Sequence, residues 1–106
     1  MRLREYLDRR GRSPFAEWFD GLPAATAVRI TAGLARMEAG NVSNAKSVGD
    51  GVSEYRMDFG PGFRIYFAVA GSDLIILLAG GTKRRQEADI RKAKQMWLDY
   101  MSRKEQ

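Results

Sequence analysis

Basic residues occur at three places in the second half of this sequence, and their cationic side chains could bind an anionic ligand. Arg56 and Arg64 lie in two neighbouring segments, and the run Lys83–Arg85 follows a stretch of apolar residues. The guanidinium group of arginine presents a planar fork of N–H donors that matches phosphate oxygens. If one face of a sheet brings these residues together, they form a binding place for an anion.

Two missing residue types narrow the chemistry that such a site could perform. The sequence contains no histidine and no cysteine, which excludes Ser-His-Asp and Cys-His triads, zinc–histidine sites, thiolate metal sites and disulfides. Acid–base catalysis would have to use carboxylates, lysine, arginine or tyrosine. We expect no metal and no cofactor, and we consider Lys46 and Glu54 as the groups that could transfer a proton.

An alternation of polar and apolar residues predicts the strands that position the arginines. Residues 53–59 and 63–69 each alternate with a period of two, as expected of strands with one apolar and one polar face. The glycine–proline–glycine connection makes them antiparallel neighbours, so Arg56, Arg64 and Tyr66 would share the polar face. An arginine exposed there adds little stability, so replacing Arg64 by alanine should leave the fold nearly unchanged.

The next strand is predicted at residues 74–78, because a continuous apolar run of this length is typical of a strand buried on both faces. Gly80 and Gly81 are predicted to break this strand, and the basic run that follows would form a loop at the sheet edge. A helix is predicted over residues 84–103, with fraying from Ser102 onward.

The first half of the chain predicts helices and one short strand. Apolar residues at spacings of three and four between residues 27 and 37 mark the buried side of a helix. In order, the predicted elements are a short strand at residues 2–7, a helix with Ser13 as its N-cap, a second helix that Gly40 ends, and a polar loop at residues 41–51 that carries Lys46.

Together these elements predict an α+β fold in a single domain, residues 1–106. It consists of a short first strand, a two-helix hairpin, a three-stranded antiparallel sheet and a C-terminal helix. The composition, 44% hydrophobic and 29% charged, is typical of a globular domain. The sequence has no apolar stretch that resembles a signal peptide or is long enough to cross a bilayer, so we expect a cytoplasmic protein.

The positive charge is concentrated at the end of the chain. The formal net charge is +5, and residues 83–106 carry eight basic and four acidic residues, a net +4. A basic surface is consistent with binding to nucleic acid or to an acidic partner protein. A solvated basic helix without a partner is the simpler alternative.

Several motifs of this sequence resemble a known protein family. FGPGFRIYF, residues 59–67, and LLAGGTKRRQEADI, residues 77–90, look like segments of the small toxins of the RelE/ParE superfamily. SPFAEWFDGL and the segment that leads to the glycine turn fit the same pattern, so the resemblance runs from about Tyr6 to about Ala93. More narrowly, the chain resembles the HigB-like addiction module killer proteins.

The resemblance implies the toxin of a bacterial type II toxin–antitoxin system. Such a toxin would inhibit translation as a metal-independent mRNA endonuclease, and similar toxins often act only on translating ribosomes. Its partner would be a cognate antitoxin, a small DNA-binding protein. By resemblance, Arg64, Lys83 and Arg56 would be catalytic, and Lys46, Tyr66, Arg84 and Arg85 would bind RNA.

Two other interpretations stay open at this point. The chain could be a non-enzymatic inhibitor of DNA gyrase, like the ParE branch, or a basic protein that binds its cognate partner without toxicity. Some similar toxins carry a tyrosine early in the last helix, where this chain has Glu87, Ala88 and Asp89, which departs from a tyrosine-assisted mechanism. Removing Arg64 should abolish RNA cleavage and matter little to gyrase binding.

Overall fold

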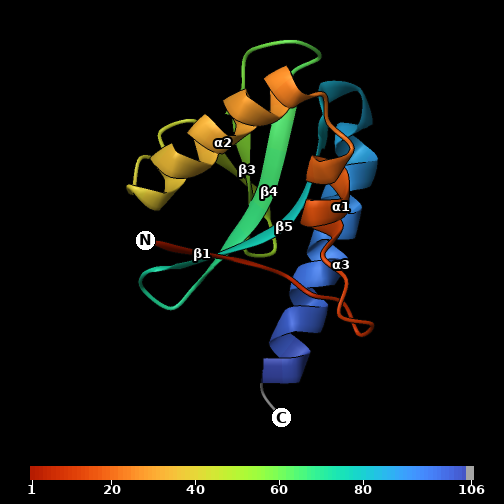
Figure 1. Ribbon diagram of the computed structural model, residues 1–106. Helices are drawn as coiled ribbons and strands as arrows, with labels where there is room; N and C mark the ends of the chain where they lie inside the picture. The colour runs from red at the N-terminus through yellow and green to blue at the C-terminus, as the bar shows by residue number, and fades with distance from the viewer. Residues whose placement is uncertain (105–106) are drawn as a thin grey trace.

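The computed structural model describes residues 1–104, which form one five-stranded sheet and three α-helices (Figure 1). The predicted α+β class is confirmed. Fraying was predicted from Ser102, but the last helix continues to Lys104, and Glu105 and Gln106 lie outside the described residues. In chain order the elements are β1 (Arg2–Glu5), α1 (Pro14–Asp20), α2 (Ala24–Glu38), β2 (Ala45–Gly49), β3 (Val52–Met57), β4 (Phe63–Ala70), β5 (Leu74–Thr82), the 3₁₀ turn η1 (Lys83–Arg85) and α3 (Gln86–Lys104).

The sheet is larger than the sequence predicted. Its strand order is β1-β5-β4-β3-β2, and the predicted antiparallel neighbours β3, β4 and β5 form its centre. β2 pairs antiparallel with β3, and β1 pairs parallel with β5. The prediction of a loop over residues 41–51 is therefore wrong for Ala45–Gly49, which form β2. This edge strand has little apolar alternation, and its backbone pairing with β3 is what makes it a strand.

β5 also differs from its prediction, because it does not end at Gly80 and Gly81 but continues to Thr82. A methyl group on Gly80 would collide with the indole ring of Trp18 in α1, and one on Gly81 would collide with the carboxylate of Asp89 in α3. The two glycines are therefore needed for the close approach of helices to opposite faces of the strand.

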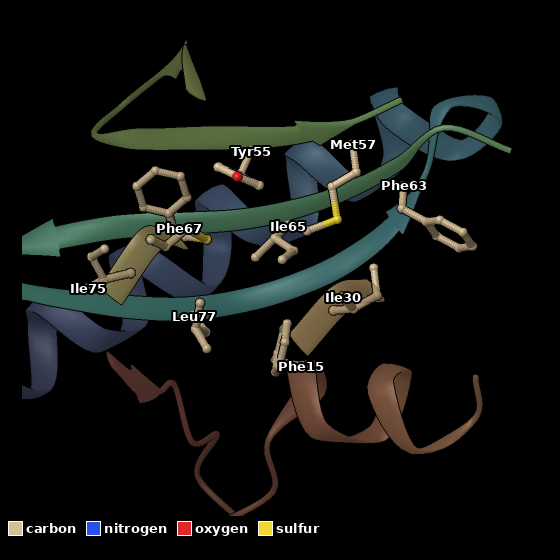
Figure 2. Close-up of a cluster of buried hydrophobic side chains, with 10 residues drawn as sticks. Phe15, Ile30, Tyr55, Met57, Phe63, Ile65, Phe67, Ile75 and Leu77 are labelled. Atoms are coloured by element: carbon tan, nitrogen blue, oxygen red, sulfur yellow. The ribbon is translucent and has the colours of Figure 1, made fainter. Parts of the chain in front are cut away.

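Different helices cover the two faces of the sheet. α1 and α2 pack on one face, where Ile30 of α2 lies among Ile65, Phe67 and other buried side chains (Figure 2). α3 packs on the other face, where Trp97 belongs to a second apolar cluster. The face predicted to be polar and open is thus covered by the C-terminal helix.

Local sequence signals fix the ends of these helices. Ser13 caps α1 as predicted, because its Oγ accepts a hydrogen bond from the backbone N–H of Ala16 at 3.0 Å. Gly40, with φ of +87°, follows α2 as predicted, and its N–H donates to the carbonyl of Met37 at 2.9 Å. None of the helices in the described part of the chain is long and apolar enough to span a membrane.

Candidate anion-binding site

β2, β3 and β4 bring predicted site residues into two adjacent rows across the sheet. Lys46, Glu54 and Tyr66 are direct cross-strand partners, one on each strand. Arg56 and Arg64 form the next row, because they are opposite partners on β3 and β4. Opposite residues of an antiparallel pair have Cβ atoms about 5 Å apart. The register therefore places five ionisable side chains side by side.

The carboxylate of Glu54 lies at the centre of these rows and is almost fully buried. Gln86, the first residue of α3, donates hydrogen bonds from Nε2 to Oε2 at 2.8 Å and to Oε1 at 3.1 Å. Arg56 Nε lies 3.7 Å from Oε1, and Arg64 Nε lies 4.0 Å from Oε2. Glu54 thus attracts both arginines as an ion-pair partner, and its burial leaves it no access to a substrate proton.

Arg64 is buried, which corrects the expectation of an exposed strand arginine. Only 4% of the residue is exposed. Its Nη1 donates to the carbonyl of Gly62 at 2.7 Å, and the backbone N–H of Lys83 donates to the same oxygen at 2.8 Å. This shared acceptor ties the β3–β4 turn to the start of the basic run. Losing the Arg64 side chain therefore affects the fold as well as any ligand.

A small polar region lies beneath the first turns of α3. Tyr66 is fully buried there, so its ring offers no stacking surface for RNA. Within residues 1–104, the Tyr66 hydroxyl and Arg64 Nε are buried without a hydrogen-bond partner. Burial raises the pKa of Tyr66, and the negative charges of Glu54 and Asp89 raise it further. Burial also raises the pKa of Asp89 above its usual value.

Lys46 and Arg56 reach the surface and line an open hollow of about 360 Å³. The side chain of Arg56 is 47% exposed even though Glu54 holds its Nε. The backbone N–H of Arg56 donates to the carbonyl of Asn44 at 3.2 Å, which fixes the loop before β2 against β3. An anion in this hollow would therefore meet an arginine that is both accessible and oriented.

A second exposed basic surface lies at η1. Lys83, Arg84 and Arg85 are exposed and, together with Arg91 and Glu87, line a hollow of about 530 Å³. The seven predicted site residues are therefore not gathered in one pocket. Lys46 and Arg56 line one hollow and the run Lys83–Arg85 lines another. Arg64 connects the two hollows. It is the cross-strand partner of Arg56, and its Nη1 donates to the Gly62 carbonyl, which also accepts from the backbone N–H of Lys83.

Sequence reasoning missed the role of Gln86. It follows the basic run and carries no charge, and its contact with Glu54 joins residues 32 positions apart, so no local pattern marks it. In the part of the chain that the structure describes, histidine, cysteine, aspartate and glutamate side chains do not gather in groups of three or more that could hold a metal ion.

The fold and the site define a small α+β protein with two basic hollows, one at β2 and β3 and one at η1, linked through Arg64 of β4. Residues 17–97 match the family described as phage-derived protein Gp49-like (DUF891), and the chain belongs to this family. The family is of the addiction-module killer, RelE-like type. An uncharacterized protein of Haemophilus influenzae is 41% identical over 81 residues, which cover 76% of this chain and 82% of that relative.

Proposed function

We propose that this protein is a toxin of the HigB-like branch of the RelE/ParE superfamily that inhibits translation by cleaving messenger RNA without a metal. The observation that carries the proposal is the direct opposition of Arg56 and Arg64. Like charges opposite each other destabilise a sheet, and burying Arg64 adds a desolvation cost. The Glu54 carboxylate offsets part of this cost, and the exposed guanidinium of Arg56 remains available to bind an RNA phosphate.

The exposed groups suit the steps that RNA cleavage requires. The 2′-hydroxyl must lose a proton, the charge that develops on the phosphate must be stabilised, and the leaving 5′-oxygen must gain a proton. Arg56 would bind the phosphate oxygens, and Lys46 in the same hollow would take the proton of the 2′-hydroxyl, with water protonating the leaving oxygen. Lys83 lines the other hollow, where it would hold the RNA strand. A ribosome that orients the RNA would allow such weak acids and bases to suffice.

Burial changes the role that we propose for Arg64. Arg56, with its exposed side chain, takes the direct contact with the phosphate. Arg64 acts from below as a positioning residue, because it holds the Gly62 carbonyl and lies beside the carboxylate that orients Arg56. Arg84 and Arg85 would hold more distant phosphates of the same RNA.

Regulated expression with mapping of RNA 5′ ends tests this function. Wild-type protein should arrest growth and produce new 5′ ends in messenger RNA. Arg56→Ala should lower cleavage by about 10²–10³-fold, by analogy with the loss of an oxyanion donor. Arg56→Lys should recover part of the rate, because an ammonium lacks the planar two-point contact. Arg10→Gln, which removes an exposed charge from the loop before α1, is the matched control.

Other outcomes would replace the proposal. A parallel supercoiling assay in which the protein inhibits DNA gyrase, without new RNA ends, would make it a gyrase inhibitor. Normal growth of cells that contain soluble, folded protein would contradict the proposal that the protein is a toxin of either kind.

We also propose that a cognate antitoxin covers the exposed basic surface at η1. The run Lys83–Arg85 and Arg91 line an open hollow there, which an acidic segment would fit. Electrostatic attraction speeds association and is screened by salt. The association rate of the two proteins, measured by stopped flow, should fall as salt rises, and a salt-independent rate would contradict this role.

A further inference from the structure

A further hollow adjoins the one that carries Arg56. It has a volume of about 240 Å³, and its walls include Arg29 and Arg36 of α2 and Phe59 of the β3–β4 loop. Asn44 and Asp58 line both hollows. Because they share these two residues, the hollows are neighbours, and we refer to the pair of them as the groove.

The α2 end of the groove carries an arginine held over an aromatic ring. Arg29 Cζ lies 3.9 Å from the centroid of the Phe59 ring, and Phe59 packs in turn on Phe63, with 5.1 Å between their centroids. Arg36 Nε donates to the hydroxyl of Tyr55 at 3.1 Å. Both guanidinium groups are thus oriented by aromatic residues of the fold, and Arg29 remains exposed.

We propose that this groove binds one unpaired nucleotide of an RNA, next to the phosphate held at Arg56. Its base stacks against the Arg29–Phe59 pair and its phosphate lies against Arg36. This inference rests on the proposed function. Unpaired bases are recognised by stacking on aromatic rings and guanidinium planes, and arginine forks match phosphate oxygens.

Asp58 favours a nucleotide over an acidic protein segment in this groove. Its carboxylate is exposed and belongs to both hollows. It would accept hydrogen bonds from the amino and imino groups on the edge of a base. The side chains of an acidic peptide offer it no such donors.

Cleavage-site mapping in cells tests the groove with variants that spare Arg56. Phe59→Leu keeps an apolar side chain against Phe63 but removes the flat ring, and Phe59→Trp restores a ring. Arg29→Gln removes the guanidinium, and Arg10→Gln is the control for the loss of one charge. Unfolding in urea confirms that each variant is folded.

Phe59→Leu and Arg29→Gln should lower cleavage by about 5–150-fold, the range that one base stack contributes. Both should also flatten the base preference beside the cleaved phosphate. Phe59→Trp should recover part of the rate that Phe59→Leu loses, and Arg10→Gln should keep the wild-type rate and preference. If Phe59→Leu and Arg29→Gln cleaved RNA at the wild-type rate and with the wild-type base preference, the groove assignment would be wrong, but the proposed function would stand. Loss of antitoxin binding with unchanged cleavage would also overturn it, by making the groove a protein-docking site. A wild-type protein that cleaves no RNA would overturn the proposed function itself.

Discussion

The two faces of the sheet share β3, β4 and β5 but differ in what they bury. The face under α1 and α2 is filled by apolar and aromatic side chains (Figure 2). The face under α3 is apolar around Trp97, but its other end encloses Glu54, Arg64 and the hydroxyl of Tyr66. A single strand pair thus supports a stabilising core on one side and a charged cluster on the other.

The difference shows how this fold separates stability from a site. Burial of an apolar side chain contributes free energy in proportion to its area. Burial of charged groups gives little net stability, because desolvation opposes their attraction. The α1–α2 face therefore stabilises the protein, and the polar end of the α3 face mainly holds Arg56 in a fixed position. Four substitutions can break or sharpen this distinction.

The largest loss of stability is expected on the apolar face. Ile65→Ala, at a fully buried position, should lower the free energy of unfolding by about 2–5 kcal/mol, because it removes apolar burial and leaves a cavity. Urea unfolding measures the loss. Val28→Ala, on the exposed side of α2, is the control and should change stability by no more than about 0.5 kcal/mol. Equal effects of the two would contradict the assignment of this core.

Arg64→Ala should cost less, about 2–3 kcal/mol in the same assay. It removes the cation beside the buried Glu54 carboxylate and the donor to the Gly62 carbonyl. Arg64→Lys should recover part of this stability, because it keeps the charge. A wild-type unfolding curve for Arg64→Ala would instead support an exposed arginine, as the sequence predicted.

Gln86→Leu should lower stability by about 1–2 kcal/mol, because the Glu54 carboxylate loses two hydrogen bonds. Amide hydrogen exchange should quicken in the first turns of α3. RNA cleavage should fall as well, because Glu54 no longer orients Arg56. Gln95→Leu, at an exposed position of the same helix, should change neither quantity. If Gln86→Leu lowered stability but left RNA cleavage unchanged, Gln86 would have no role in positioning Arg56.

Asp89→Asn should give the smallest effect, a gain in stability near neutral pH. Burial raises the pKa of Asp89, while Arg85 and Lys92 act against this. A carboxyl with a raised pKa in the folded state costs stability as pH rises from the unfolded value of 3.8 through the folded pKa. The advantage of the asparagine variant should therefore vanish below pH 3.8, as thermal unfolding across this range would reveal.

Asp99→Asn is the matched control with the opposite sign. Its pKa is lowered, chiefly by the hydrogen bond from the Tyr6 hydroxyl and also by Arg103 and Arg9. Its carboxylate therefore contributes stability above pH 3.8 and loses it as pH falls through the lower folded pKa. Asp99→Asn should destabilise the protein near neutral pH. The same sign of change in both variants would contradict the pKa assignments.

Much of the centre of this fold could be predicted because its signals are local. Alternation alone placed Arg56, Arg64 and Tyr66 on one face, and the short turn made the two arginines neighbours. Alternation could not show what covers that face, because the apolar stripe of α3 would suit either side of the sheet. The burial of Arg64 therefore could not be predicted.

Other features of the site depend on contacts between distant segments. β2 exists through its pairing with β3 and has no clear pattern of its own. Gln86 and Glu54 are 32 residues apart, and the groove combines α2, the loop before β2 and the β3–β4 loop. The family resemblance supplied the basic positions, but the division into two hollows follows from tertiary packing.

The adjacent glycines of β5 should tolerate substitution very differently. A side chain at Gly80 would meet the rigid indole of Trp18, so few replacements should survive a screen for folded protein. A side chain at Gly81 would meet the end of Asp89, which can rotate aside. Replacements at Gly81 should thus remain folded while shifting the first turns of α3 above Glu54. Random mutagenesis of these two neighbouring codons should therefore yield folded protein mainly with glycine at position 80, but with several residues and different activities at position 81.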